Sequence, residues 1–489
     1  MGYIAGVDRE QQVLFPETLD EYVAEDNAVR FIDAFVATLD MAKLGFARAI
    51  PGEDGRPAYD PRDLLRLFIY GYLNRTRSSR KLEIETHRNL EVIWLMRKLR
   101  PDHKTISIFR REHPEALKQV TREFTVLCKE LNLFGSSLVF IDGSKFRAVN
   151  NKDRNFTGPR LKKLLAMIDE RIDEYLKELE EADAAEEGRA GATDADLRTK
   201  IEALRERKKL YASYQEQLKE SGEKQLSLTD PESRRMKVRG DMDVCYNVQI
   251  AVDSKHHLIV AHDVTDEVND REQLAPMAVA ALEELGVGTL EVGADRGYHN
   301  GAHVVECEAN GITPYVPAPN TSKNQGRGLF TKEEFTYSAE RDAYLCPAEQ
   351  WLSPCTESVK NGRTLLYYAN WEACAGCPLR EQCTTAKQGR RIMRTPEEER
   401  VDAMAERLKE RPELMLERKC VVEHPFGTVK RSWDGSYFLL KGLRKVRGEF
   451  SLAVLAYNIR RVLNLLGVEC LLEVLRSRKL TPQPLARAA

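Results

Sequence analysis

Residues 138–145 read LVFIDGSK, and this stretch decides the fold. Four successive apolar residues predict a buried strand, and Asp142 places a carboxylate at the exit of that strand. A second candidate strand, residues 290–294 (LEVGA), is followed by Asp295, and Glu423 lies in the later segment VVEHPFGTVK. Hard divalent cations such as Mg²⁺ bind carboxylate oxygens and keep positions open for phosphate and water. The three acids together therefore predict a metal site for phosphoryl transfer, although each alone is more often a turn or cap residue.

The composition is that of a globular protein, with 42% hydrophobic and 31% charged residues among 489. No stretch approaches 18 uninterrupted apolar residues, so we expect no membrane span. The first residues lack a signal-peptide core and ten cysteines include pairs at metal-ligand spacing, which predicts a protein of the reducing cytoplasm rather than one with a disulfide framework. The net charge of −2 argues against a uniformly basic DNA-coating protein. Basic residues nevertheless outnumber acidic ones in 62–111 and 418–447, which favours local phosphate binding.

The hydrophobic pattern predicts a mixed α/β fold in which an all-helical N-terminal domain precedes the sheet. The expected domains are a helical DNA-binding domain over 1–130, a catalytic domain over 131–480 and a C-terminal tail over 481–489. The expected elements of the sheet domain are strand 138–141, a hairpin of 244–252 and 257–264, helix 271–285, strand 290–295, helix 302–309 and strand 313–316. Two insertions interrupt this domain: a charged antiparallel helical hairpin over 158–220 and a Cys-rich segment over 335–390.

The Cys-rich segment has metal-ligand spacing. Cys374 and Cys377 form a C-x₂-C knuckle, Cys383 follows it, and Cys346 lies upstream. Four thiolates suit a tetrahedral Zn²⁺ site or an iron–sulfur cluster. Cys355 competes as the fourth ligand, and a set of free buried thiols is the alternative without metal.

The blocks FIDGS (140–144), ADRGY (294–298) and VEHPFGTVK (422–430) resemble the catalytic blocks of DDE-type transposases of bacterial insertion sequences. The third block resembles the Tyr/Arg/Glu/Lys signature of one large superfamily, in which a Lys follows the Glu by seven residues, as Lys430 does here. The sequence departs from that signature at Leu416, where Tyr is expected, and at Lys419, where Arg is expected with Arg418 beside it. Residues 229–234, Asn269-Asp270 and the Cys knuckle resemble a subgroup with a Cys-rich insertion.

The resemblance implies a ribonuclease-H-like fold in which Asp142, Asp295 and Glu423 bind Mg²⁺ or Mn²⁺. It implies a transposase that cleaves the ends of an insertion sequence and transfers the freed strand into target DNA. The implied partner is double-stranded DNA, both the terminal inverted repeats and the target, bound by a homodimer. The expected DNA contacts are Arg418, Lys419, Lys430, Arg431, Arg110 and Arg111. Glu449 is a rival third carboxylate, and Trp433 either stacks on an unpaired base or packs in the core.

Two other functions fit the same residues. One is a metal-dependent nuclease of the same fold that cuts DNA without joining it. The other is a non-catalytic zinc-containing DNA-binding protein. Terminal inverted repeats beside the gene favour the transposase over the nuclease, and loss of cleavage in an Asp142→Asn variant excludes the non-catalytic alternative.

Overall fold

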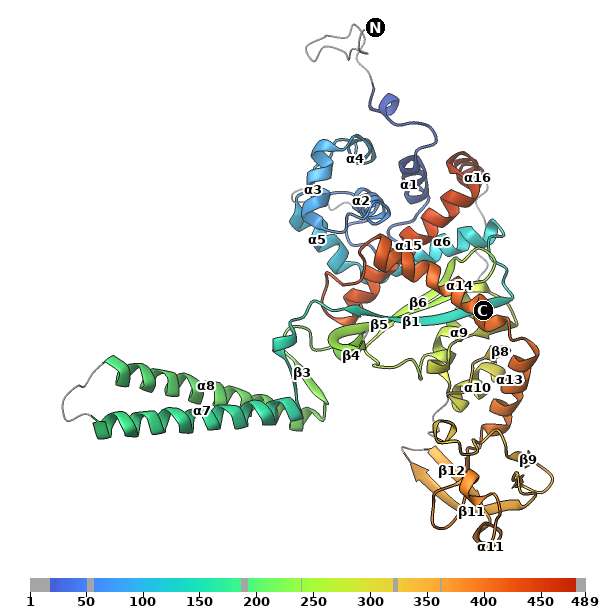
Figure 1. Cartoon of the computed structure of the whole chain (residues 1–489). Coiled ribbons are helices and arrows are strands. Elements are labelled where there is room, and N and C mark those ends of the chain that lie inside the picture. Colours follow the sequence, from blue (N-terminus) through green and yellow to red (C-terminus); the bar gives the residue numbers. More distant parts are fainter. Residues whose placement is uncertain are drawn as a thin grey trace, which may run out of the picture.

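The computed structural model of the chain describes residues 18–50, 57–185, 192–238, 240–319, 324–360 and 363–480. The expected tail, 481–489, lies outside this part of the chain. Figure 1 shows a central sheet with the N-terminal helices on one side, a long helical hairpin that projects from it, and a small separate sheet at the far end. The mixed α/β architecture expected from the sequence is therefore confirmed.

The central sheet has the strand order β4-β5-β1-β7-β8, with β6 also paired to β5. The strands are β1 (Leu138–Arg147), β4 (Arg234–Val238), β5 (Asp241–Asp253), β6 (Ile259–Thr265), β7 (Leu290–Gly293) and β8 (Ile312–Tyr315). β1 runs parallel to β7 and antiparallel to β5, and β7 runs parallel to β8. The strand expected to end before Asp142 continues to Arg147, because β5 pairs with β1 as far as Arg147 opposite Cys245. Asp142 therefore lies within a strand, which corrects the sequence prediction.

The N-terminal helices pack on one long C-terminal helix, α15 (Leu443–Leu466). In the described part of residues 18–130 the regular elements are η1 (Leu19–Tyr22), α1 (Ala28–Ala37), α2 (Pro61–Leu73), α3 (Ser79–Arg88), α4 (Leu90–Leu95), α5 (His103–Glu112) and α6 (Pro114–Glu130). α15 contacts α2, α5, α6 and β6 and is buried on nearly every side. Gly448 permits this packing, since a Cβ at that position would overlap Pro114 at the start of α6.

The expected helical hairpin consists of α7 (Gly158–Ala185) and α8 (Ala192–Ser221), which Figure 1 shows as a projecting arm. The arm has its own small core of Ile168, Ile172, Leu179, Leu197 and Ile201. The chain enters and leaves the arm through two short paired strands, β2 (Asn155–Thr157) and β3 (Gln225–Ser227). The arm is thus attached at one place on the molecule.

The Cys-rich segment folds as a second sheet of five strands between β8 and helix α13. Its elements are β9 (Thr336–Ser338), β10 (Ala343–Leu345), β11 (Trp351–Lys360), β12 (Arg363–Ala369), β13 (Arg391–Arg394), α11 (Trp371–Ala375) and α12 (Arg380–Cys383). It has a separate core that includes Phe335, Tyr344 and Tyr368. The other helices are α9 (Leu274–Leu285), α10 (Gly301–Ala309), α13 (Glu398–Glu410), α14 (Leu414–Phe426) and α16 (Val468–Leu480).

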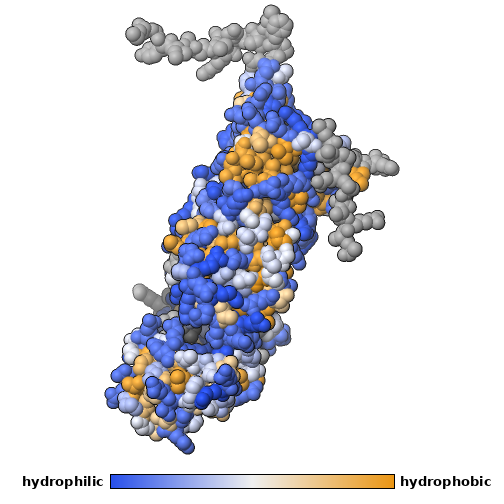
Figure 2. All heavy atoms as spheres, turned by 90° about the vertical axis from the view of Figure 1, so that its right-hand side faces the viewer, coloured by the Kyte–Doolittle hydropathy of each residue, from blue (hydrophilic) through white to orange (hydrophobic). Residues whose placement is uncertain are grey.

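The face drawn in Figure 2 is mainly hydrophilic, with a compact hydrophobic patch in its upper part. Among the described helices, none combines the length and the apolar character that crossing a bilayer requires.

Candidate active site

Asp142 and Asp295 meet where the parallel pairing of β1 and β7 stops. The last paired residues are Phe140 and Gly293, so Asp142 lies two residues beyond the last partner on β1. Asp295 lies two residues beyond the end of β7 and caps a short 3-10 turn, η3 (Arg296–Tyr298). Its Oδ1 accepts a hydrogen bond from the Gly297 amide at 2.7 Å. The sheet therefore brings the first two predicted acids to one place.

Arg418 on α14 lies between these two carboxylates. Its Nη2 is 2.7 Å from Asp142 Oδ1 and 3.8 Å from Asp295 Oδ2. Burial raises the pKa of Asp142 to about 6 against the opposing effect of the Arg418 charge, and the carboxylates of Asp295 and Asp270 add to the rise. One guanidinium therefore only partly compensates a cluster of negative charge. The Nε of Arg418 is buried and has no hydrogen-bond partner among the described residues.

Glu423 is on the same helix as Arg418 but faces elsewhere. α14 buries Leu414, Val421, Val422 and Pro425 against the sheet, whereas Glu423 is exposed. At 3.6 residues per turn, Glu423 lies on the opposite side of the helix from this buried face. Across the described ranges, no three His, Cys, Asp or Glu side chains are grouped so that they hold a metal ion. The structure thus brings Asp142 and Asp295 together and does not join Glu423 to them.

Lys430 reaches the catalytic strand through a π-helical turn, η5 (Gly427–Ser432), which directly continues α14. Its Nζ donates to Ser144 Oγ at 2.7 Å and to the Lys145 carbonyl at 2.6 Å, both on β1. It also lies 4.5 Å from the ring centroid of Phe146. Single π-helical turns are frequent at functional sites, and this one directs Lys430 toward the strand that carries Asp142.

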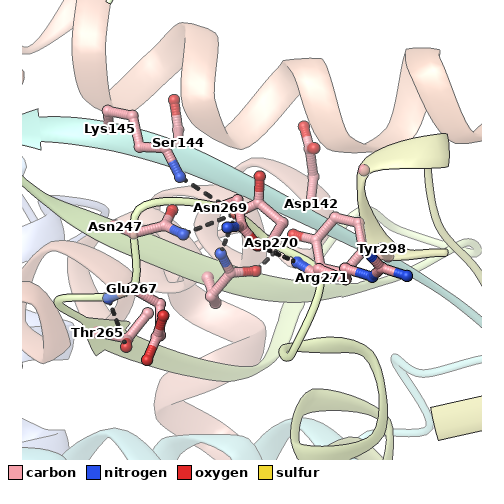
Figure 3. Close-up of polar contacts among 12 residues, drawn as sticks. Asp142, Ser144, Lys145, Asn247, Thr265, Glu267, Asn269, Asp270, Arg271 and Tyr298 are labelled. Atoms are coloured by element: carbon pink, nitrogen blue, oxygen red, sulfur yellow. Dashed lines mark hydrogen bonds and ion pairs between the residues drawn. The ribbon is translucent and has the colours of Figure 1, made fainter. Parts of the chain in front are cut away.

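Asp270, between β6 and α9, is a third carboxylate beside Asp142, and no catalytic role was predicted for it from the sequence. Its Oδ1 accepts hydrogen bonds from Asn247 Nδ2 and Gln249 Nε2, both at 2.7 Å, and from Lys145 Nζ at 3.3 Å (Figure 3). In the sequence, Asp270 was named only as part of the Asn269-Asp270 pair that resembles the subgroup with a Cys-rich insertion. The available signal was a polar Asn-Asp turn before a helix, and the residues that bind Asp270 are far from it in sequence.

Tyr298 completes this network from the turn that follows Asp295. Its hydroxyl donates to Gln249 Oε1, and Figure 3 shows its ring beside Asp142 and Asp270. Burial, reinforced by Asp270 and Asp142, raises the pKa of Tyr298 well above its ordinary value. The hydroxyl therefore stays protonated and remains a donor, which fixes the orientation of the Gln249 amide.

Gly143 leaves no space for a side chain inside this network. A Cβ at this position would lie 2.5 Å from Gln249 Nε2, 2.6 Å from Asp270 Oδ1 and 2.9 Å from Tyr298 Oη. We expect Gly143→Ala to lower the free energy of unfolding by about 1–3 kcal/mol, because overpacking forces its neighbours to move. Urea unfolding measures the change, and Gly288→Ala, where a Cβ meets open space, is the matched control. Equal stability of the two variants would contradict the close packing.

The six predicted DNA contacts differ in their exposure. Lys419, Arg431 and Arg111 are exposed, whereas Arg418 and Lys430 make the contacts described above. Arg110 is only 3% exposed, and its Nη1 donates to Tyr72 Oη at 3.3 Å and to the Arg77 carbonyl at 3.1 Å. Its position inside the helical bundle does not support the predicted DNA contact. Arg110 instead holds α5 against α2 and the loop that contains Arg77.

Glu449 and Trp433 both have structural roles. The carboxylate of Glu449 is 2% exposed and accepts hydrogen bonds from the amides of Leu439 and Leu440 at 2.9–3.0 Å. It fixes the chain that precedes α15 and is not a free ligand. Trp433 is 8% exposed and belongs to the main core, so packing is the better interpretation than base stacking.

Four cysteines of the second sheet line one small cavity: Cys346, Cys374, Cys377 and Cys383. Cys355 is exposed on β11, where its Sγ donates to the Tyr367 carbonyl at 3.2 Å. Gly389, with φ +108°, approaches so closely that a Cβ would lie 2.5 Å from Cys374 Cβ. The four thiols face one cavity and leave Cys355 outside, although within the described chain no three of them are close enough together to hold a metal ion.

Two segments of the chain match family models. Residues 17–112 match "Transposase domain (DUF772)", and residues 345–463 match "Transposase DDE domain". A comparison with curated proteins finds no match. Among solved structures, the chain is similar to the piggyBac transposase in its cryo-EM synaptic complex with hairpin DNA, with 10% identity over 95% of this chain and 87% of that chain. The TM-score of 0.25 is too low to carry a functional argument.

Proposed function

We propose that this chain is a DDE-type transposase whose chemistry takes place where Asp142 and Asp295 meet between β1 and β7. The meeting of these two acids around one cation, Arg418, is the observation that carries the proposal. The strand order β6-β5-β1-β7-β8, with β5 antiparallel to its neighbours and β1, β7 and β8 parallel, supports a ribonuclease-H-like catalytic fold.

The donor set suits a hard divalent cation, Mg²⁺ or Mn²⁺. Carboxylate oxygens are the ligands such ions prefer. Burial is the main cause of the raised pKa of Asp142, and the carboxylates of Asp295 and Asp270 add to it against the effect of Arg418. We propose Asp142, Asp295 and Glu423 as the ligands. Glu423 lies on the exposed side of α14, so its carboxylate joins the aspartates only if α14 rotates and gives up part of its packing against the sheet. A bound metal ion lowers the pKa of an attacking water and neutralises charge on a phosphate.

Transposition consists of two in-line displacements at phosphorus with the same development of charge, so one site serves both. In the first, water cuts the element's end and frees a 3′-hydroxyl. In the second, that hydroxyl attacks a phosphate of target DNA. Lys430 and Arg418 do not transfer protons in this scheme. Lys430 fixes β1 beside Asp142, and Arg418 holds the carboxylates of Asp142 and Asp295 near each other.

The test uses duplex DNA of the element's labelled end, Mg²⁺ and a plasmid target. We expect a cleaved end and a product joined to the plasmid. Cleaved 3′-hydroxyl ends that accumulate without any joined product would favour the nuclease. No cleavage with either Mg²⁺ or Mn²⁺ would contradict both enzymatic functions.

We propose that exposed cations bind the DNA backbone around this site. Arg111 on α5, Lys419 on α14 and Arg431 in η5 are exposed and come from the two basic regions of the sequence. A homodimer would present both ends of the element to one target, as the resemblance implies. Removing one of these cations should reduce the slope of log affinity against log salt by about 0.9 on duplex DNA, because one phosphate is then no longer neutralised.

We further propose that Cys346, Cys374, Cys377 and Cys383 bind one Zn²⁺, with an iron–sulfur cluster as the alternative. Cys374→Ser should then lower the zinc content from about one atom per chain to near zero, since a closed site needs all four thiolates. Elemental analysis of protein purified without oxygen measures the content, and Cys355→Ser is the matched control that should retain its metal. Protein without metal, in which all four thiols titrate freely while folded, would exclude the site.

A further inference from the structure

A polar cavity of about 490 Å³ lies where the N-terminal helices meet the catalytic helix, outside the aspartate site. It is bounded by the end of α2, the last part of α14 with the turn η5, and the end of α15. Its lining consists of Leu73, Asn74, Arg75, His424, Thr428, Ser432, Trp433, Tyr457, Arg460, Arg461 and Asn464. Three arginines line this cavity and no Asp or Glu does, so its electrostatic potential is positive.

The three guanidiniums are held in place by neutral acceptors. Arg75 Nη2 donates to Ser432 Oγ at 3.3 Å, Arg460 Nη2 to the Leu73 carbonyl at 2.9 Å and Arg461 Nε to the His256 carbonyl at 2.8 Å. In the described part of the chain, none of them has a carboxylate within ion-pair distance. Each bond leaves further N–H groups on the same guanidinium free to donate to another acceptor. The arginines are thus positioned but not neutralised.

The backbone around Arg75 shows how the site is built. Arg75 follows α2 with φ +63°, a left-handed conformation that is uncommon for a residue with a side chain. This conformation ends the helix and places Arg75 against Ser432 of the catalytic segment. Trp433 and Tyr457, 8% and 2% exposed, form a rigid wall behind the charged groups. The cavity therefore has fixed walls and a cationic lining.

We propose that this cavity, the phosphate groove, binds the phosphodiester backbone of one DNA strand. Guanidinium groups suit phosphate oxygens because they offer paired N–H donors in a plane, and Thr428, Ser432 and Asn464 add hydroxyl and amide donors. The volume is that of a small-ligand site, which accommodates a short length of one strand and excludes a duplex. His424 and Thr428, which line the groove, follow Glu423 closely in the sequence, so a strand held there passes beside the proposed third ligand.

The inference rests on the proposed function, because it assigns this groove to the strand that the same protein cuts. The two basic regions, 62–111 and 418–447, include Arg75 and part of the lining but neither Arg460 nor Arg461, so they did not predict this groove. Arg460 and Arg461 belong to a helix that reads as apolar core, and Arg75 comes from the N-terminal helices more than three hundred positions earlier. The fold alone brings them together.

The test measures binding of a labelled single-stranded oligonucleotide of about 12 nucleotides, without metal, over a range of salt concentrations. The double variant Arg75→Gln/Arg461→Gln should bind more weakly and reduce the salt slope by about 1.4, since each phosphate contact on a single strand contributes about 0.7. The control, Arg122→Gln/Arg478→Gln, removes the same charge from arginines that pair with Glu284 and Glu130, and should bind as wild type. Arg75→Lys/Arg461→Lys, which keeps both charges, should retain most of the slope.

Unchanged affinity and slope in the Gln double variant, with a thermal melt like wild type, would overturn the proposal. So would a loss of binding that the control variant shares. Strong competition by a deoxynucleoside monophosphate or inorganic phosphate, with oligonucleotide binding intact in the Gln variant, would make the groove a site for small anions and also overturn it. The binding measurement does not depend on cleavage. It therefore tests the phosphate groove even if the protein shows no activity in the strand-transfer assay.

Discussion

Asp142→Asn is expected to lower the rate of DNA cleavage by on the order of 10³-fold or more, while DNA binding is retained. Asparagine keeps the shape of the side chain but removes the negative charge that a divalent cation requires, and losing several kcal/mol of transition-state stabilisation corresponds to a factor of this size. Burial raises the pKa of Asp142, so the position tolerates a neutral side chain, but Asn leaves Arg418 without its ion-pair partner, and a thermal melt of the variant measures that cost.

Single-turnover cleavage of labelled end DNA measures this effect, and anisotropy with the same DNA confirms that binding persists. Asp153→Asn is the matched control, since Asp153 is an exposed aspartate whose ion pair with Arg160 is remote from the sheet edge. Cleavage by the Asp142 variant within tenfold of wild type would remove Asp142 from the catalytic centre.

Arg418→Ala is expected to destabilise the metal-free protein by about 3–5 kcal/mol, because it leaves Asp142 without its cation in a partly buried site. Mg²⁺ should restore much of this stability, because a divalent ion then supplies the missing positive charge between Asp142 and Asp295. The rise in Tm on adding Mg²⁺ should accordingly be larger for the variant than for wild type.

The matched control for this prediction is Arg411→Ala. Arg411 precedes α14 and pairs with Glu291 on β7, but both side chains are about a third or more exposed, so the expected loss is below about 1 kcal/mol. Equal losses in the two variants, or no added effect of Mg²⁺ on the Arg418 variant, would show that Arg418 does not compensate the carboxylates.

The sequence predicted that Asp142, Asp295 and Glu423 share one site; the structure brings the two aspartates together, because both follow buried strands that pair in parallel, and it leaves Glu423 apart from them. The prediction placed the end of β1 too early, since pairing with β5 depends on a partner one hundred residues away. Helical periodicity did not show that Lys430 lies near Phe146 beside Phe426, because a π-helical turn brings it there.

The roles of Arg110 and Asp270 could not be predicted from the sequence, because the surroundings of each side chain form only when the chain folds. Arg110 belongs to a basic segment, and charge alone does not show that a guanidinium is buried beside Tyr72. The role of Asp270 depends on donors from β1 and β5 that only the folded sheet collects. The spacing of cysteines, in contrast, is a local signal, and it identified the four that line one cavity.

The position of α15 has a consequence for how the chain is made. Helices α2, α5 and α6 complete their core only with α15, which emerges from the ribosome roughly 300 residues after α6, or some tens of seconds later at ordinary rates of synthesis. Until then their apolar faces have no permanent cover. We therefore expect nascent N-terminal helices to depend on chaperones, and a premature stop before α15 to yield a product that proteases remove rather than a competing DNA-binding fragment.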